Sequence, residues 1–367
     1  MAEPIRVAHV MGKMVGGGVE QVVMNYYRHI DRSRVQFDFL VDADSTLVPK
    51  DEIESFGGRV FEIPPYQHQL AYQRALVPLL CDQGWKIVHS HINALSVFPL
   101  RAAKKAGVPV RIAHSHSASG KGGEEWAKKA LKALLKTQSK RYSTHRMACS
   151  RFAGEWLFGK GSCFEVVYNA IELSKFSFNP ILRERVRSEL GISEKQLVVG
   201  HVGRFMPQKN HRFLIDVFDK VAQIRQDAIL VLVGNGELEK QIKSLTLDRK
   251  ISDRVHFLGQ RLDMDAIYQA FDVFVLPSLY EGLGLVAIEA QRAGLPCFLS
   301  DRITREVDVT HTIRFLSINN PLIWANCICS TEQNERVDVD PEDFKSYDIG
   351  IASVELARRY KELSDRL

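Results

Sequence analysis

The sequence predicts an α/β protein with two successive domains, each built on a parallel sheet, that face a shared cleft. The length of 367 residues suits two such domains. Short apolar runs alternate with helix-length amphipathic segments almost throughout, which is typical of parallel sheets with crossover helices on both faces. The alternation stops near Asn169–Phe176 and then starts again, so we place the linker there.

The first domain is expected to span residues 1–172. Six apolar runs predict its strands: residues 5–10, 37–42, 59–64, 86–91, 110–116 and 146–150. Helical spacing of the apolar residues predicts helices over Val19–Ile30 and Ala94–Ala106. Ligand-binding loops are expected at the carboxyl ends of these strands.

The second domain is expected to span residues 173–350. Its strands are predicted at residues 197–203, 228–234, 255–259, 273–278 and 296–300. Plausible helices follow, for instance Asn210–Arg225 and Gly284–Ala293. The final segment, 351–367, has helical spacing, and we expect it to pack on the first domain.

Composition points to an ordinary soluble protein, with 45% hydrophobic and 25% charged residues. No run of about eighteen apolar residues occurs, so no transmembrane helix is expected. The start, "MAEPIRVAHVMG", enters a strand directly and does not resemble a signal peptide. Six scattered cysteines without a C-x-x-C pair predict reduced thiols in a cytoplasmic protein.

The charge is unevenly distributed. Between Arg101 and Arg146 lie twelve Lys or Arg and two acids, a formal +10 within a chain of net +5. Such a basic segment favours an anionic partner. Within it, Glu124–Tyr142 is either a basic helix packed on its sheet or a helix at an anionic membrane surface, and the two are compatible. We expect no nucleic-acid partner.

A glycine-rich stretch, "GKMVGGGVEQ" (Gly12 to Gln21), follows the first strand. Glycines between a strand and a helix let backbone amides approach a phosphate or a sugar, so Gly16, Gly17 and Gly18 are candidate donor contacts. The spacing fits neither G-x-G-x-x-G nor a Walker loop, which disfavours a dinucleotide enzyme. A tight turn without a ligand is the alternative.

Three D-x-D pairs occur: Asp42/Asp44, Asp263/Asp265 and Asp338/Asp340. A pair of this kind holds a divalent metal in some sugar transferases of a different fold. Because two acids one residue apart are common by chance, we interpret all three as surface or capping acids. No metal site is therefore predicted.

The strongest signal is "YEGLGLVAIEAQRAGLP" after the strand at 273–278. Glu281 lies in a glycine-rich loop, and Glu289 lies about a turn and a half into the following helix. The free amides of Gly284 and Leu285 are placed to meet a diphosphate. The carboxylates can accept hydrogen bonds from a ribose diol (Glu289) and from sugar hydroxyls (Glu281).

This stretch resembles the E-x-x-x-x-x-x-x-E motif of the retaining family-four glycosyltransferases, which have the GT-B fold. The loop between the glutamates, with Gly282, Leu283 and Gly284, then contacts the donor. Leu283 departs from the usual Phe, an apolar change that can reshape the sugar pocket.

The resemblance extends over nearly the whole chain. "VGRFMPQKNHRFLI" is similar to the family's G-R-x-x-x-x-K segment, which implies that Arg204 and Lys209 neutralise the nucleotide diphosphate. "LVLVGNGELEKQI" is similar to the next strand and its turn, which implies a place near the base or ribose for three residues: Gly234, Asn235 and Gly236. The segment "YNAIELSKF" resembles the family's interdomain segment, with Ala170 and Glu172 replacing Gly and Asp.

Two histidine pairs, His89/His91 and His114/His116, end predicted strands, and alternation points each pair to one side of its strand. The resemblance implies that one first-domain histidine contacts the transferred sugar, and we favour His116 over His114. Structural histidines, or histidines at the acceptor rim, are the alternative for the others. Metal binding would need ligands that the spacing does not supply.

The resemblance implies a retaining, metal-independent hexosyltransferase without a cofactor. It also implies a UDP-sugar as the donor, with GDP next, and a glycan or lipid-linked glycan as the acceptor. "RIAHSHS" and "GGVEQVVMNYYRHID" resemble bacterial capsular or exopolysaccharide enzymes. We expect a cytoplasmic protein, peripheral at the inner face of the cell membrane. The alternatives are a sugar-nucleotide epimerase of the same fold and a non-catalytic homologue that binds a nucleotide or a partner.

Overall fold

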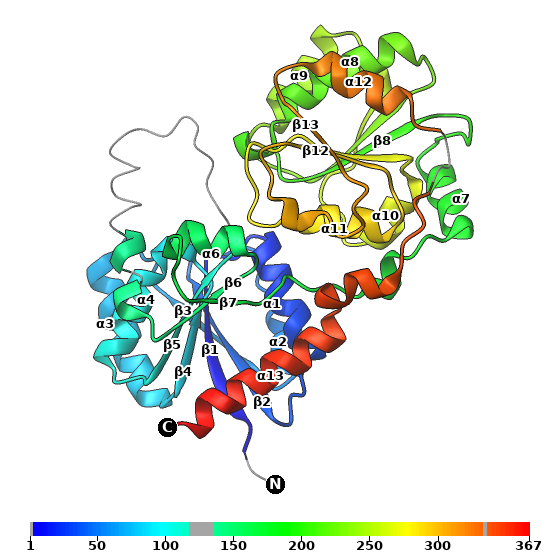
Figure 1. Cartoon of the computed structure of the whole chain (residues 1–367). Helices are drawn as coiled ribbons and strands as arrows, with labels where there is room; N and C mark the ends of the chain where they lie inside the picture. Colours follow the sequence, from blue (N-terminus) through cyan, green and yellow to red (C-terminus); the bar gives the residue numbers. More distant parts are fainter. Residues whose placement is uncertain (1–2, 117–134, 139, 333–335) are drawn as a thin grey trace. The chain divides into compact units, whose positions relative to one another are not determined.

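A computed structural model describes residues 3–116, 135–138, 140–332 and 336–367. The chain forms two compact units: unit 1 comprises Met1–Ile171 with Ser346–Leu367, and unit 2 comprises Glu172–Lys345. Each unit is a parallel sheet with helices on both faces, so the predicted fold class is confirmed (Figure 1).

Unit 1 contains a seven-stranded sheet in the order β3-β2-β1-β4-β5-β6-β7. Its strands are β1 (Ile5–Gly12), β2 (Val35–Asp42), β3 (Arg59–Ile63), β4 (Ile87–Ser90), β5 (Val110–Ser115), β6 (His145–Ala148) and β7 (Glu165–Val166). Its helices include α1 (Gly18–His29), α2 (Lys50–Ser55), α3 (Gln69–Gln83), α4 (Val97–Lys105), α6 (Arg151–Phe158) and α13 (Ile349–Asp365). Because β1 pairs with both β2 and β4, the strand order reverses beside β1.

Unit 2 contains a six-stranded sheet in the order β10-β9-β8-β11-β12-β13. Its strands are β8 (Val198–Val202), β9 (Ile229–Val233), β10 (Val255–Phe257), β11 (Val273–Leu276), β12 (Cys297–Ser300) and β13 (Arg314–Leu316). Its α-helices are α7 (Pro180–Glu189), α8 (His211–Ile224), α9 (Glu239–Asp248), α10 (Met264–Ala270), α11 (Leu285–Arg292) and α12 (Pro321–Cys329). Here β8 lies between β9 and β11, so the order reverses beside β8.

The central strands of both units are buried because both faces of each sheet are covered. All eight residues of β2 and all five of β9 are buried. Every residue of β9 is apolar, so a continuous apolar run predicted it, whereas β2 also buries Gln36, Asp38 and Asp42.

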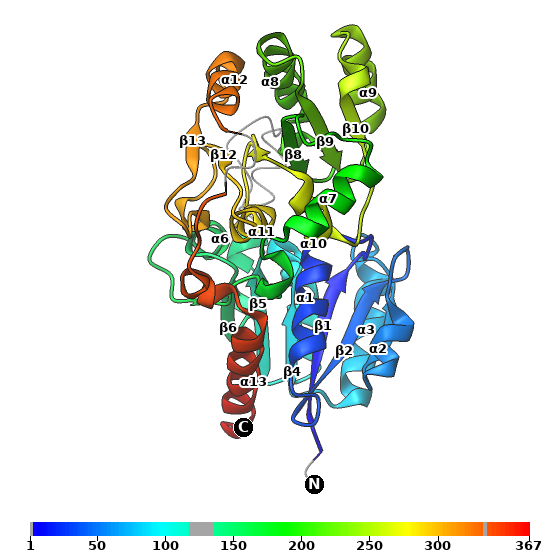
Figure 2. The same cartoon turned by 90° about the vertical axis from the view of Figure 1, so that its right-hand side faces the viewer.

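The chain returns to unit 1 at its end. The amide of Ile171 donates to Tyr347 O at 2.9 Å, and the amide of Ile349 donates to Ile171 O at 3.0 Å. Helix α13 then packs beside α1 and β1 (Figure 2). The segment Ser346–Leu367 is thus part of unit 1.

Several element boundaries differ from the expectations. The helix expected over Ala94–Ala106 is a 3-10 turn (Asn93–Ser96) followed by α4, and Cys297–Ser300 is followed by a 3-10 turn rather than an α-helix. The amphipathic segment Glu124–Tyr142 lies largely outside the described residues. None of the described helices is long and apolar enough to cross a membrane. None of the six cysteines forms a disulfide.

Candidate active site

In unit 2, the loops that follow β8 and β11 are joined at the point where the strand order reverses. The amide of Leu279 donates to Gln208 O at 2.8 Å, and Gln208 Nε2 donates to Tyr280 O at 2.9 Å. Ligands of open α/β sheets bind at such a point, outside the carboxyl ends of the strands. The two loops carry Arg204, Lys209 and Glu281, the charged residues expected to contact the diphosphate and the sugar.

A buried ion pair links the two loops. Lys209 Nζ lies 2.7 Å from Glu281 Oε1, and the two side chains are only 14% and 8% exposed. Gln208 Nε2 donates to the other carboxylate oxygen at 3.1 Å. The structure therefore brings together a cation suited to a phosphate and a carboxylate suited to sugar hydroxyls.

Arg204 lies on the same β8 loop, but its side chain is exposed. It forms no ion pair with any residue in the described part of the chain, so its guanidinium can bind an anion without losing a protein partner. A guanidinium is well matched to phosphate because it donates two parallel hydrogen bonds.

Helix α11 begins directly after the β11 loop. Gly284 precedes it with φ of 86°, a left-handed conformation that favours glycine, and no side chain caps the helix. The first turn, with Leu285, thus keeps backbone amides that no capping side chain occupies. Leu283 is buried (1% exposed) and Gly282 is buried beside it.

Glu289 lies in α11 and accepts a hydrogen bond from Tyr268 Oη at 2.8 Å. Burial raises the pKa of Glu289 to about 7, while the Tyr268 hydroxyl and the charge of Lys209 oppose the shift. The influence of Lys209 connects Glu289 electrostatically to the ion pair. A carboxyl poised near neutrality can accept hydroxyl hydrogen bonds once it is ionised.

The turn after β9 supports the β8 loop. A Cβ on Gly234 would lie 2.3 Å from Gly203 O, and one on Gly236 would lie 2.4 Å from Phe205 O. The amide of Phe205 donates to Asn235 O at 2.8 Å. These contacts give the glycines a packing role that is independent of a nucleotide.

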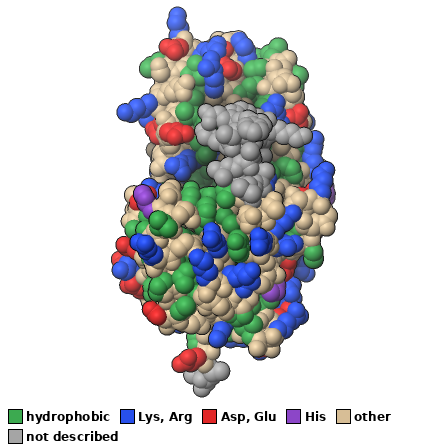
Figure 3. All heavy atoms as spheres, turned by 90° about the vertical axis from the view of Figure 1, so that its left-hand side faces the viewer, with side chains coloured by type: hydrophobic (Ala, Val, Ile, Leu, Met, Phe, Trp, Pro, Cys, Tyr) green, Lys and Arg blue, Asp and Glu red, His purple; other side chains and the backbone are tan. Residues whose placement is uncertain are grey.

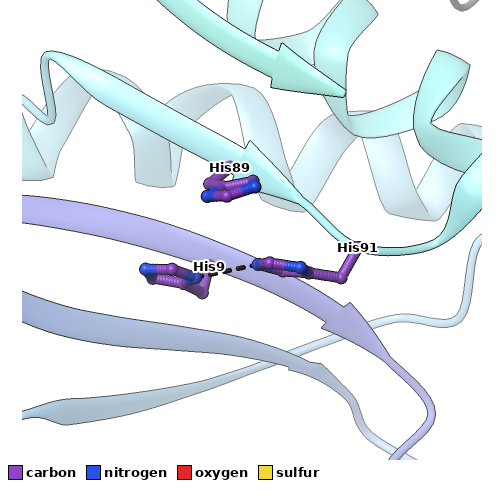
Figure 4. A group of neighbouring side chains, drawn as sticks. All are labelled: His9, His89 and His91. Atoms are coloured by element: carbon purple, nitrogen blue, oxygen red, sulfur yellow. Dashed lines mark hydrogen bonds between the residues drawn. The ribbon is translucent and has the colours of Figure 1, made fainter. Parts of the chain in front are cut away.

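In unit 1, five histidines from three neighbouring strands form one buried group, which we call the histidine cluster: His9 on β1, His89 and His91 at the end of β4, and His114 and His116 at the end of β5. His91 bonds through both ring nitrogens, to His9 Nδ1 at 2.9 Å and to His116 Nε2 at 2.8 Å. Figure 4 shows His9 and His91 joined edge to edge with His89 beside them. His89 also bonds through both ring nitrogens: Nε2 lies 3.0 Å from His114 Nδ1, and Nδ1 lies 2.6 Å from Tyr360 Oη.

Burial lowers the pKa of every histidine in the cluster. The pKa of His9 falls to about 3 and that of His116 to about 4, where a polar contact with Asn169 partly opposes the shift. The pKa values of His89, His91 and His114 are also well below the usual value, through burial and then through neighbouring histidines. The five rings are therefore neutral near pH 7.

The glycine-rich loop of unit 1 is occupied by a carboxylate from the chain itself. Glu20 accepts hydrogen bonds from the amides of Val15 at 3.0 Å and Gly16 at 2.6 Å. Gly17 and Gly18 begin α1, which has no side-chain cap. An anionic ligand at this loop would have to share the Val15 and Gly16 amides with Glu20.

Three contributors carry no recognisable signal in the sequence: His9, Gln208 and Tyr268. Their partners lie on other strands, loops or helices, so only the tertiary fold brings them together. Two of the D-x-D acids form ion pairs, Asp44 with Lys13 at 2.7 Å and Asp263 with Arg261 at 2.6 Å. Among the described residues, side chains at metal-ligand spacing belong to the histidine cluster.

Comparisons with known proteins agree with this arrangement. The model of the family "Glycosyl transferases group 1" matches residues 183–313, and that of "Glycosyl transferase 4-like domain" matches residues 17–168. The chain is 36% identical to the putative glycosyltransferase EpsF of Bacillus subtilis (strain 168), over 88% of this chain and 86% of that protein. It is 24% identical to the capsular polysaccharide biosynthesis glycosyltransferase CapH of Staphylococcus aureus, over 97% and 98%.

Among solved structures, Anabaena Alr3699/HepE in complex with UDP and glucose superposes with a TM-score of 0.75 at 19% identity, covering 99% and 98% of the two chains. Two parallel Rossmann-like units, each with its loops at a strand-order reversal, form the GT-B fold. The chain belongs to family four of these enzymes, the group 1 glycosyltransferases, of the capsule and exopolysaccharide type.

Proposed function

We propose that this glycosyltransferase transfers a hexosyl group from a nucleoside-diphosphate sugar with retention of configuration, and that catalysis requires no metal ion. UDP is the favoured nucleotide and GDP the next. The observation that carries the proposal is the Lys209–Glu281 ion pair at the strand-order reversal of unit 2. It supplies one group for each half of a sugar nucleotide.

When the sugar nucleotide binds, its diphosphate replaces Glu281 as the partner of Lys209. Arg204 and the first backbone amides of α11 donate further hydrogen bonds to the diphosphate. Glu281 is then released to accept hydrogen bonds from the sugar, and Glu289 accepts those of the ribose. Lys209 and Arg204 also stabilise the charge that develops on the leaving diphosphate.

The reaction needs no protein nucleophile. The bond between the anomeric carbon and the phosphate oxygen breaks as the acceptor oxygen bonds to the same face of that carbon. The acceptor's proton passes to an oxygen of the departing phosphate. In unit 1, His116 is the side chain that we assign to the transferred sugar, in preference to His114.

The acceptor that we propose is a glycan or lipid-linked glycan of a bacterial surface polysaccharide. In support, a relative that is 28% identical over 81% of this chain is the Escherichia coli UDP-Gal:alpha-D-GlcNAc-diphosphoundecaprenol alpha-1,3-galactosyltransferase. Three basic residues of α4 are exposed: Arg101, Lys104 and Lys105. Figure 3 shows Lys and Arg spread over the visible face of unit 1, consistent with peripheral contact with anionic lipid.

Thermal unfolding with UDP, GDP, ADP and their sugar conjugates, each with and without EDTA, tests the proposal. A ligand at a hundred times its dissociation constant adds about 2.7 kcal/mol of stability. We expect a shift with UDP that EDTA does not remove. The absence of a shift with every nucleotide would favour the non-catalytic homologue, and conversion of the sugar nucleotide without an acceptor would favour the epimerase.

A further inference from the structure

The histidine cluster lines a cavity of about 20 Å³ in unit 1, enough for one water-sized sphere. Four buried polar atoms that line it make no hydrogen bond to any described residue: His9 Nε2, His114 Nε2, His116 Nδ1 and Asn169 Oδ1. Only two other side-chain atoms in the described part of unit 1 are in this state, on Tyr72 and Gln73. Unsatisfied polar atoms are rare in native cores, so their concentration in one cavity indicates a missing ligand.

The cluster also has the spacing of a metal site. His91, His114 and His116 each offer one nitrogen within 4.8 Å of the others, and so do His9, His89 and His91. The three strands that carry these residues are direct neighbours in the sheet, which fixes their spacing. His91 belongs to both groups, so the two sets cannot be used independently.

We propose that unit 1 binds one divalent transition-metal ion of the Zn²⁺ class through His91, His114 and His116, with water or Asn169 Oδ1 as the fourth ligand. We favour this set over the set with His9 because Asn169, whose Oδ1 has no hydrogen-bond partner among the described residues, lies beside His116 and can complete the coordination.

Little rearrangement is needed to admit the ion. Zn–N bonds of about 2.05 Å in a tetrahedral site place the ligand nitrogens about 3.3 Å apart. His91 Nδ1 and His116 Nε2 are 2.8 Å apart in the structure, where they share a hydrogen bond. Small rotations of the two rings open that contact. The proton that it holds moves to the other nitrogen of the same ring, so both ligands remain neutral imidazoles.

The ligand set determines the metal. Neutral imidazoles suit Zn²⁺, Co²⁺, Ni²⁺ and Cu²⁺, whereas Mg²⁺ and Ca²⁺ require oxygen ligands. No described residue lining the cavity is Asp or Glu, so the ion retains its charge and favours a bound hydroxide as the fourth ligand.

All the residues of this site belong to unit 1, whereas the residues assigned to the nucleotide diphosphate belong to unit 2. Within the proposed function, it would occupy His116, the side chain assigned to the sugar. The ion is therefore an inhibitor of transfer and not a catalytic cofactor.

The test uses the full chain without an affinity tag, freed of metal and titrated with Co²⁺ and then Zn²⁺. We expect one ion per chain by calorimetry, a visible ligand-field band of tetrahedral Co²⁺, and displacement of Co²⁺ by Zn²⁺. Mg²⁺ should give no signal. Loss of a residue that merely supports a metal ligand costs about 10- to 100-fold in affinity. His91→Ala and His116→Asn remove ligands themselves, so each should lower the Co²⁺ affinity by more than that.

The control variant, His256→Gln, alters a histidine of unit 2 and should bind like the wild type. A cooperative unfolding transition of each metal-free variant verifies that it is folded. If His91→Ala does not fold, His116→Asn alone provides the test. Absence of stoichiometric binding, or binding that both folded cluster variants retain, would overturn the proposal. Nucleotide-induced stabilisation is measured separately, so failure of the metal site leaves the proposed function standing.

Discussion

Lys209 Nζ lies 2.7 Å from Glu281 Oε1, although the two residues belong to loops that follow different strands of unit 2. Each charge satisfies the other while no donor is bound. A ligand that binds Lys209 must therefore release Glu281. Removal of the Lys209 charge should weaken nucleotide binding, whereas removal of the Glu281 charge should not.

Lys209→Met should weaken binding of the nucleoside diphosphate. A hydrogen bond to a charged group contributes about 1.5–3 kcal/mol, so the dissociation constant should rise by about 10-fold or more. Calorimetric titration with UDP measures the change. Lys240→Met, which removes an exposed lysine from α9, is the matched control and should leave the affinity as it is.

Glu281→Gln should separate nucleotide binding from transfer. The substitution removes the carboxylate that competes for Lys209, so free UDP should bind as tightly as to the wild type or more tightly. Transfer should fall by at least about 100-fold, because an amide orients the sugar hydroxyls less well than a carboxylate. Equal losses of UDP affinity and transfer would show that Glu281 only supports the loop.

Glu289→Gln should change the pH dependence of stability. The pKa of Glu289 in the folded chain is raised to about 7 from 4.5. Its contribution to the free energy of unfolding is therefore fully present below pH 4.5 and is lost as the pH rises through about 7. Unfolding of the wild type should show this loss relative to the Gln variant, measured across the same pH range without nucleotide.

The same ionisation should govern donor affinity in the opposite sense. Only the carboxylate of Glu289 can accept both ribose hydroxyls, so UDP affinity of the wild type should rise as the pH passes through about 7. In Glu289→Gln the affinity should be lower and nearly level with pH. A rise that persists in the variant would assign the dependence to another group.

Gly236→Ala should destabilise unit 2. Gly236 has φ of 155°, and the added Cβ would lie 2.4 Å from Phe205 O and 2.8 Å from Phe205 N. Backbone cannot move away as a flexible side chain can, so we expect a loss of about 2 kcal/mol or more, measured by denaturant unfolding. Gly18→Ala, where the new Cβ meets nothing within 4 Å, should leave stability unchanged.

The sequence predicted the sheets better than the contacts within the sites. Buried strands such as β9 and β11 are continuous apolar runs, and the motif around Glu281 and Glu289 lies on one loop and one helix. Short strands at the sheet edges were missed, because β7 has two residues and β13 has three, too few to form an apolar run.

Contacts between strands depend on sheet order, which local sequence does not encode. His9 is a single histidine in an apolar strand, and it joins His91 only because β1 pairs with β4. The contacts of Glu20 were also not predicted. From the sequence it is an ordinary acid in the first turn of α1, but its carboxylate accepts hydrogen bonds from the Val15 and Gly16 amides of the loop expected to contact the donor.

The return of α13 to unit 1 has a consequence for the order in which the protein folds on the ribosome. Tyr360 of α13 reaches His89 at 2.6 Å, so the unit synthesised first acquires this part of its core only after nearly the whole chain has emerged. Unit 2, a continuous insertion between Ile171 and Ser346, has by then been fully translated. The two units are therefore completed in the reverse of the order in which their synthesis begins. Unit 2 can fold before α13, the last helix of unit 1, has been synthesised.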